Sequence, residues 1–262
     1  MDSILTRLLF AARFRDLNLL ISDQVTADSQ LLMNRSLGER LQLIAPFLAY
    51  DKDPYLVVTD EGRMVYVQDA YTVSDRFPNA QSFAGDTLGV RSGLRGQSIN
   101  YLRNSVKVVM DAYDGSMTFY VADPSDPLIR AWSGVFPTLF KPLDTMPSGL
   151  RSHLRVPEEL FNVQTATYAR YHVTDPVVFY QNNDLWKVPQ PSQAKDTTSG
   201  PLPLVAYYVY LRMPGAATPD FLLLPPPSPH ARSHMNGALS ATTGAAPTRQ
   251  CTGEQFPHRS IL

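Results

Sequence analysis

The sequence predicts an α+β protein in which antiparallel hairpins occupy the middle of the chain and helical segments flank them. Three observations support this fold class. Val- and Tyr-rich segments separated by turn residues occur at 55–73 and 106–121, as in β-hairpins. Apolar residues recur at helical spacing near the N-terminus. Two Asp-Pro pairs each precede an apolar segment, which is typical of the first turn of a helix.

The first fifty residues are predicted to be mainly helical. Arg7 interrupts the opening apolar run and no small-residue cleavage site follows it, so the segment differs from a signal peptide. A short helical segment follows at 16–23, and Ser36 with Glu39 matches a capping box at the start of a third helix. The apolar side chains of the opening segment share one face of an amphipathic helix, with the arginines turned away: Ile4, Leu5, Leu8, Leu9 and Ala12.

Two hairpins are predicted in the middle of the chain. The first joins strands 55–58 and 64–73 through a turn at 60–63. The second runs from Val106 to Val121, and its Asp114-Gly115 pair suits a two-residue turn with positive φ angles. Val106, Val108 and Met110 would share one face of that hairpin. The four glycines of residues 85–98 predict a loop between the hairpins.

Helices are predicted again after the second hairpin. The aspartates of Asp126-Pro127 and Asp175-Pro176 can each accept amide hydrogens of a first turn, while the proline occupies a position that needs no amide hydrogen. The longest helix is predicted at 157–172, beginning at Pro157. Helical spacing predicts that five of its residues form one face: Leu160, Phe161, Gln164, Tyr168 and Tyr171.

The C-terminal part changes in composition. A polar linker at 189–203 precedes predicted strands at 204–213 and 221–224, which complete a soluble α+β region over residues 1–224. Residues 225–262 are rich in proline and contain one aromatic residue. Such a segment buries too little apolar surface to offset its ordering entropy, so a disordered tail is predicted there.

Charge and composition exclude several classes of function. With 23 basic and 24 acidic side chains the net charge is −1, which leaves no excess to neutralise phosphates, so no nucleic-acid partner is expected. A single cysteine, Cys251, excludes an internal disulfide and a multi-cysteine zinc site. No apolar run reaches the roughly 20 residues that span a bilayer. We expect no transmembrane segment, no cofactor and no metal site, although His230 and His234 have a spacing that can chelate a metal.

Five residues are candidates for catalysis. Asp111 and Tyr113 can form an acid-rich site, or they can simply complete the hairpin turn beside Asp114. His153 and His172, with Asp175, can form an acid–base centre, or they can bond to carbonyl groups at helix ends. No nucleophile, base and orienting group can be assembled from these residues, so the structural interpretation is favoured for all five.

Two weaker patterns point to ion binding. Arg91 and Arg95 lie in the glycine-rich loop, where an anion can bind, but the loop matches neither the Walker pattern nor the dinucleotide fingerprint. Asp51 and Asp53 resemble part of a cation-binding loop that lacks its closing glutamate. A turn before Pro54 explains them more simply.

Long segments of the chain carry a family resemblance: RLLFAARFRDLNLLISDQV, RLQLIAPFLAYDKDPYLVV, NYLRNSVKVVMDAYDGSMTFYVADPSDPLIRAW and FPTLFKPLDTMPSGLRSHLRVPEELFNVQTATYARYHVTDPVVFYQNNDLWKVP. They resemble uncharacterised protein family 0182, large bacterial multi-pass membrane proteins in which a block of membrane helices precedes a big soluble region. The likeness runs from about Ile4 to about Ala241. It implies a location at the plasma membrane, on the extracytoplasmic side, and supplies no catalytic residues.

The same resemblance implies that this chain is a truncated copy of the soluble region, without the membrane helices and with final residues unlike the family. The strands at 204–213 and 221–224 are then expected to lack partners. Two functions remain open. One is a binding or assembly module that contacts protein or other envelope components, with AYYVYLRM (206–213) docking against protein. The alternative is a cell-envelope enzyme, hydrolase-like, that uses carboxylates and histidines.

Overall fold

The structure is a computed structural model in which the chain divides into two compact units, Met1–Phe47 and Leu48–Leu262. The described residues are 3–29, 31, 33–84, 94, 96, 98–182, 186–187, 206–212, 220–224, 228–229, 237–242 and 251–255.

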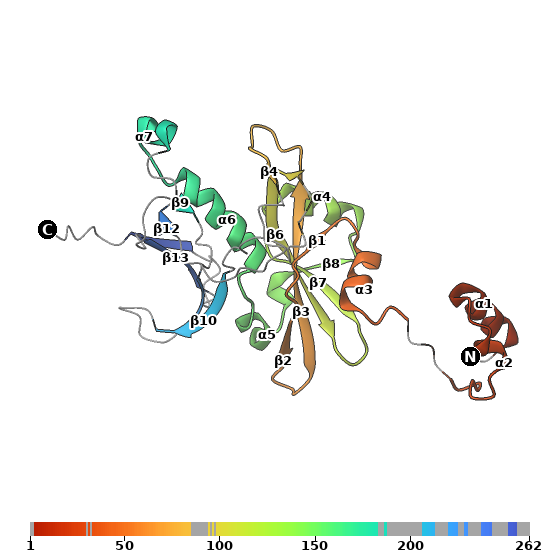
Figure 1. The fold of residues 1–262 in the computed structure, drawn as a ribbon. Coiled ribbons are helices and arrows are strands. Elements are labelled where there is room, and N and C mark those ends of the chain that lie inside the picture. The colour runs from red at the N-terminus through yellow and green to blue at the C-terminus, as the bar shows by residue number, and fades with distance from the viewer. Residues whose placement is uncertain are drawn as a thin grey trace, which may run out of the picture. The chain divides into compact units, whose positions relative to one another are not determined.

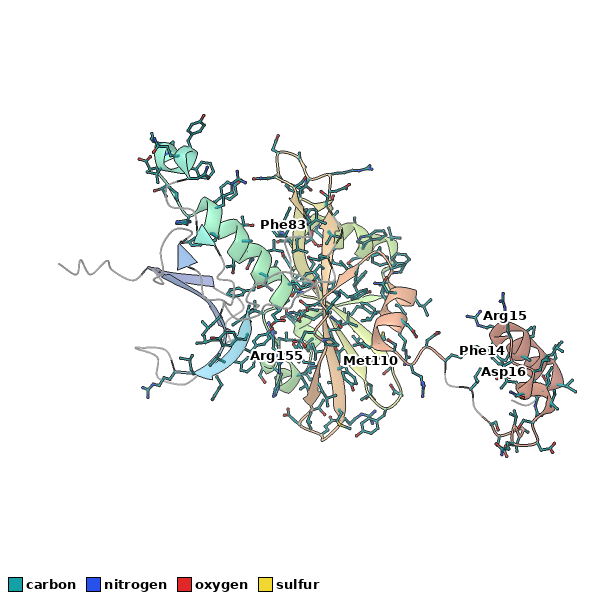
Figure 2. All side chains as sticks on the ribbon, viewed as in Figure 1. Phe14, Arg15, Asp16, Phe83, Met110 and Arg155 are labelled. Atoms are coloured by element: carbon teal, nitrogen blue, oxygen red, sulfur yellow. The ribbon has the colours of Figure 1, made fainter. Side chains whose placement is uncertain are left out.

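The first unit contains three helices (Figure 1): α1 (Ile4–Phe14), α2 (Asn18–Ile21) and α3 (Leu37–Ile44). The helices predicted from the sequence are confirmed. The Ser3 side chain caps α1 by accepting from the Thr6 amide, and α1 ends at Arg15 in a left-handed conformation. Phe14, Arg15 and Asp16 mark this end of the helix in Figure 2. Helix α3 starts after Ser36 as predicted, but that side chain makes no capping hydrogen bond, so the predicted capping box is wrong.

A six-stranded sheet forms the centre of the second unit. Strands β3 and β6 are the two longest and lie side by side, and β2 pairs with β3 alongside β1. All pairs are antiparallel except β7 with β8. Both predicted hairpins are therefore confirmed. The strands are β1 (Ala49–Tyr50), β2 (Tyr55–Val58), β3 (Met64–Ser74), β6 (Tyr101–Asp111), β7 (Met117–Val121) and β8 (Phe140–Pro142).

The turn of the second hairpin differs from the prediction. Strand β6 ends at Asp111 and β7 begins at Met117, so five residues connect them. Only Gly115 of the predicted Asp114-Gly115 pair has a positive φ, of 69°. The Gly115 amide donates to the Asp111 carbonyl over 2.9 Å. The prediction of a two-residue turn was wrong because the Asp111 carboxylate accepts backbone amides of the loop and so stabilises a wider turn.

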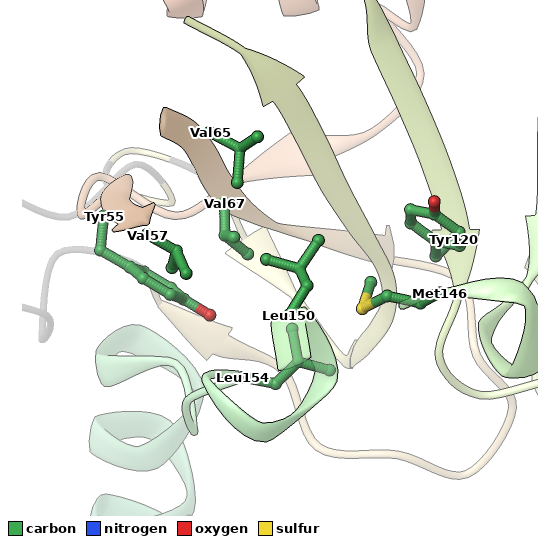
Figure 3. Packing of buried hydrophobic residues seen from close by; sticks show 8 residues of the cluster. All are labelled: Tyr55, Val57, Val65, Val67, Tyr120, Met146, Leu150 and Leu154. Atoms are coloured by element: carbon green, nitrogen blue, oxygen red, sulfur yellow. The ribbon is translucent and has the colours of Figure 1, made fainter. Parts of the chain in front are cut away.

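One face of the sheet packs on a short helix, α5 (Ser148–Ser152), and on the residues beside it. Figure 3 shows Leu150 and Leu154 directed at side chains of β2 and β3, with Met146 beside Tyr120 of β7. Removing these side chains from water stabilises the unit by roughly 25 cal/mol for each Å² of apolar surface. The cluster consists of Tyr55, Val57, Val65, Val67, Tyr120, Met146, Leu150 and Leu154.

Three further helices follow the predicted starts. They are α4 (Pro127–Val135), α6 (Glu158–Tyr171) and α7 (Pro176–Gln181), and a short 3₁₀ helix lies at Leu143–Thr145. Asp126 and Asp175 cap α4 and α7 as predicted, each accepting first-turn amides.

Of the residues predicted to share one face of α6, only Phe161 is buried. The helix buries residues with shorter side chains at i, i+4 spacing, whereas Tyr168 and Tyr171 are exposed. The two tyrosines instead contact other rings, His172 and Phe179 respectively. The buried residues are Glu159, Phe161, Thr165 and Ala169.

A second sheet has four antiparallel strands in the order β10-β11-β13-β14. Strands β10 and β11 confirm the predictions at 204–213 and 221–224. The expectation that these strands lack partners is wrong for β11, because β13 pairs with it. The strands are β10 (Tyr207–Leu211), β11 (Asp220–Leu224), β13 (Gly237–Thr242) and β14 (Cys251–Gln255).

Part of the segment predicted to be disordered is therefore in strands. Strands β13 and β14 both lie within 225–262, as does β12 (Ser228–Pro229), which pairs with β9 (Trp186–Lys187). Backbone pairing holds such strands in a sheet without strong apolar alternation, which is why composition missed them. The remaining pair is β4 (Phe83–Ala84) with β5 (Ser98–Ile99). The predicted linker at 189–203 lies outside the described residues.

The helices of the described residues are short. None of them combines the length and apolar character needed to cross a bilayer.

Phe161 tests the packing of α6. Phe161→Ala should lower the free energy of unfolding by about 3–5 kcal/mol, because the ring is fully buried against Val156, Ala206 and Leu223. Tyr168→Ala is the matched control, with an expected loss below about 1 kcal/mol, since that ring is 40% exposed. Urea denaturation measures both. Equal losses would show that the face of α6 is assigned wrongly.

Candidate functional site

Asp111 and Tyr113 lie at the turn between β6 and β7. Arg63 Nη2 lies 2.6 Å from Asp111 Oδ2, and the Tyr113 amide donates to Asp111 Oδ1 over 2.8 Å. The guanidinium of Arg63 also stacks over the Tyr113 ring at 5.2 Å from its centroid. The hydrogen bond from Arg63, followed by that from the Tyr113 amide, holds the pKa of Asp111 below its usual value. These contacts order the hairpin tip.

The other three catalytic candidates lie at helix ends. His153 Nδ1 is 2.7 Å from the Gly149 carbonyl oxygen, and His172 Nδ1 is 3.2 Å from the Tyr168 carbonyl oxygen. The Asp175 carboxylate accepts from two amides of α7. In Figure 1, α7 and the turn between β6 and β7 lie at opposite ends of their unit, so the structure does not gather the five candidates in one place.

Most of the ion-binding candidates lie in parts of the chain that the structure does not describe. Arg91, Arg95, His230 and His234 lie outside the described residues. Within the described residues, no group of three or more histidine, cysteine, aspartate or glutamate side chains is arranged to hold a metal ion.

The structure places a polar cluster in the interior that sequence reasoning missed. Lys107 of β6 lies directly opposite Asp69 of β3, and both side chains are buried, with the Lys107 side chain 0% exposed. The Lys107 ammonium pairs with the Asp69 carboxylate. It also donates to the Arg155 carbonyl oxygen over 3.1 Å. A buried charge requires such partners, because an unpaired one costs several kcal/mol.

Asp51 is the second member of this cluster, and side chains of β3 contact it. The Tyr71 hydroxyl donates to its Oδ2 atom, and the Glu159 amide donates to the same oxygen over 3.4 Å. The Gln68 side chain donates to the Asp51 carbonyl over 2.6 Å. Burial raises the pKa of Asp51, and the Tyr71 hydrogen bond lowers it in part. Asp51 therefore ties β3 to the first turn of α6.

Glu158 is the group of the cluster that titrates near neutrality. Burial raises its pKa from 4.5 to about 7, with further contributions from the negative charges of Asp53 and Asp51. Burial also raises the pKa of the Tyr71 and Tyr208 phenols, so both stay protonated. Glu158 is therefore a carboxyl that can exchange a proton near neutral pH.

Arg155 connects this cluster to the second sheet. Its guanidinium lies over three aromatic rings, with centroids 4.4 Å away at Tyr55, 5.1 Å at Phe221 and 5.5 Å at Tyr208. These rings belong to β2, β11 and β10, and Figure 2 shows Arg155 beside β10. The Tyr208 hydroxyl donates to the Val156 carbonyl over 2.6 Å. Cation–π contacts contribute about 0.5–2 kcal/mol, depending on how far the site is desolvated. Because the three rings come from both sheets, Arg155 joins the two sheets.

Asp126 forms a separate buried site on the other side of β6. Its carboxylate accepts from the Thr72 and Ser105 hydroxyls over 2.5 Å each, and from the Tyr101 hydroxyl over 2.6 Å. Burial raises the pKa of Asp126, but these hydrogen bonds and that of the Leu128 amide outweigh it, so the pKa lies below its usual value. Both oxygens of the carboxylate accept hydrogen bonds, and these bonds fix the start of α4 against β3 and β6.

One sequence signal could have indicated the missed cluster. Lys107 lies between Val106 and Val108 in a predicted strand, so it occupies the opposite face. A strand face that carries a lysine ordinarily meets solvent. It is covered instead by the segment that leads into α6, and Asp69 stands opposite Lys107 in the register of β3 and β6.

The Lys107–Asp69 pair gives the first test of the cluster. Lys107→Met should lower the free energy of unfolding by about 3–5 kcal/mol, because it leaves the Asp69 charge buried without its partner. The double variant Lys107→Met/Asp69→Leu should recover most of that loss, since a buried pair is often replaceable by apolar groups. Urea denaturation measures both. Lys141→Met, at an exposed position of β8, is the control. A double variant no more stable than Lys107→Met would contradict the assignment.

The pKa of Glu158 gives the second test. Because its pKa is raised in the folded state, its contribution to stability is full below about pH 4.5 and is lost as the pH rises through about 7. Glu158→Gln should remove that loss, which we expect to be about 1 kcal/mol between pH 5 and pH 8 after screening by solvent. Unfolding free energies at the two pH values measure it. Glu61→Gln, at the exposed turn between β2 and β3, should retain the original pH dependence.

Comparison with known proteins places the chain in a family. The family described as Uncharacterised protein family (UPF0182) matches residues 1–262. A UPF0182 protein of Pelobacter propionicus is 40% identical over 100% of this chain and 27% of its own length. A UPF0182 protein of Geobacter sulfurreducens is 40% identical over 98% of this chain and 26% of its own length. A UPF0182 protein of Bradyrhizobium diazoefficiens is 42% identical over 97% of this chain and 26% of its own length.

The chain thus spans about a quarter of the length of these curated relatives. No solved structure matches it. The family match extends to residue 262, so the prediction that the residues after Ala241 are unlike the family was wrong. The chain belongs to Uncharacterised protein family (UPF0182).

Proposed function

We propose that this chain is a binding or assembly module, without catalysis of its own, in the extracytoplasmic part of a membrane-protein family. The observation that supports this proposal is that the charged groups of the interior contact other parts of the fold. Lys107, Asp51 and Arg155 each contact backbone or side chains of a different element, and these contacts join the two sheets and α6. Groups engaged in this way hold a scaffold together and are not available to a substrate.

The exposed aromatic residues of β10 supply the binding surface. This strand is at the edge of the four-stranded sheet, and its Tyr207 and Tyr210 side chains are 52% and 68% exposed. Tyrosine contributes large contact area together with a hydroxyl, and an edge strand offers backbone groups for pairing. We assign β10 to contact with protein, either another envelope component or the membrane-linked part of a full-length relative.

The resemblance to multi-pass membrane proteins supports the proposed location. A position at the plasma membrane, on the extracytoplasmic side, suits a module whose partners are envelope proteins. The net charge of −1 argues against nucleic acid as a partner.

One observation favours an enzyme as the second candidate. Glu158, with a pKa raised to about 7 by burial, lies near the charge of Asp51 and can act as an acid or a base. A cell-envelope hydrolase would use this carboxyl. The first proposal is preferred because Asp51 is engaged with Tyr71 and the Glu159 amide.

Site-specific photo-cross-linking tests the proposed function. A photoreactive phenylalanine analogue replaces Tyr207 or Tyr210 in this chain, which is then mixed with membranes that contain a full-length UPF0182 protein. A discrete protein adduct is expected at both positions, at least about fivefold above the control, because aromatic edge residues concentrate interface contact. The control places the analogue at Tyr113, which is 63% exposed at the tip of another hairpin.

Equal labelling at all three positions would contradict the assignment of β10. Adducts that persist when membranes lacking the family member are used would assign the partner to another envelope protein.

A further inference from the structure

Helix α1 presents its most apolar side to solvent. At 100° per residue, five apolar side chains of α1 lie within an arc of roughly 140°. Phe10 lies on the opposite side of the helix and stacks on Phe14 at 6.1 Å, whereas the buried Ala11 lies next to Ile4 at one border of the arc. The exposed arc consists of Ile4 at 84%, Leu5 at 63%, Leu8 at 53% and Leu9 at 61%, together with Ala12.

Arginines border this arc. On the helical wheel Arg13 follows Leu9 at one border, and Arg7 lies beyond Ile4 at the other. Arg15 stands at the C-terminal end of α1, where Figure 2 labels it. Asp16 is the only acidic residue from Ser3 to Ile21, so the segment carries a net charge of +2 in a chain whose total is −1.

Exposed apolar side chains continue into the next helix. Leu17, which precedes α2, and Ile21, at its end, are 67% and 74% exposed. A group of exposed apolar side chains such as the arc on α1 marks an interaction surface. Its basic border indicates which surface it fits, because arginine extends its charged end toward phosphate while its aliphatic stem stays in the apolar layer.

We propose that α1 is an interfacial helix that binds the surface of a bilayer rich in anionic lipid. The arc from Ile4 to Leu9 lies at the boundary of the acyl chains, and Arg7, Arg13 and Arg15 reach the lipid phosphates. With 11 residues the helix lies in the plane of the surface and does not cross the bilayer. Each basic residue near an anionic surface adds about 1 kcal/mol to binding.

A second copy of the chain fits this face less well. Arginines border both sides of the arc, so pairing two such faces brings like charges together at each edge. An anionic lipid surface supplies the opposite charge along the whole helix. This surface is separate from β10, so failure of lipid binding leaves the proposed protein contact intact, and the reverse also holds.

Vesicle sedimentation tests the proposal on the full 262-residue chain. We expect binding to vesicles of equal parts phosphatidylglycerol and phosphatidylcholine, and at least tenfold weaker binding to phosphatidylcholine alone, with the difference reduced by salt. Leu8→Ala/Leu9→Ala should weaken binding by about tenfold, since alanine retains the helix while removing buried carbons. Arg7→Gln/Arg13→Gln should weaken binding to the anionic vesicles only.

The matched control removes exposed apolar groups from another part of the chain. Leu56→Ala/Val58→Ala, on the solvent side of β2, should bind like the unmodified chain. No binding to anionic vesicles, or equal binding by all variants, would overturn the proposal. Concentration-dependent dimerisation that Leu8→Ala/Leu9→Ala abolishes, without vesicle binding, would assign this face to a second copy and overturn it as well.

Discussion

The buried ammonium of Lys107 is the interaction on which the second unit depends. It pairs with Asp69 across the two central strands and reaches the Arg155 carbonyl oxygen, so one side chain bonds both the sheet and the segment that leads into α6. An isolated charge in this position would be strongly unfavourable, which means that its partners must be in place whenever β3 and β6 are paired. The path of the chain from α5 to α6 is fixed by this requirement.

That segment then determines how the two sheets meet. Arg155 lies among rings from β2, β10 and β11, and Val156 packs with Phe161 and Leu223 in one apolar cluster. The amide that opens the first turn of α6 bonds to Asp51. Charged and polar groups of the interior therefore connect structural elements, and the two surfaces that we propose for partners, the exposed aromatic residues of β10 and the apolar arc of α1, lie outside this interior.

The sequence predicted the parts of the fold that depend on local signals. Alternation of Val and Tyr located β2, β3, β6 and β7, and each Asp-Pro pair marked a helix whose aspartate accepts first-turn amides. Features that depend on distant contacts were missed. Lys107 meets Asp69 through the strand register, 38 residues apart, and α6 buries Thr165 and Ala169, which local spacing alone did not indicate. Strands β13 and β14 have weak patterning of their own and are held by backbone pairing with a neighbour.

Native-state hydrogen exchange tests most directly whether Lys107 and Arg155 make the two sheets one cooperative unit. Amides in the centre of β6 and amides of β11 should open with free energies that agree within about 1 kcal/mol and respond equally to denaturant. If β11 opened several kcal/mol more easily than β6, with its own denaturant dependence, the two sheets would be independent. The interior charges would then hold only the six-stranded sheet together.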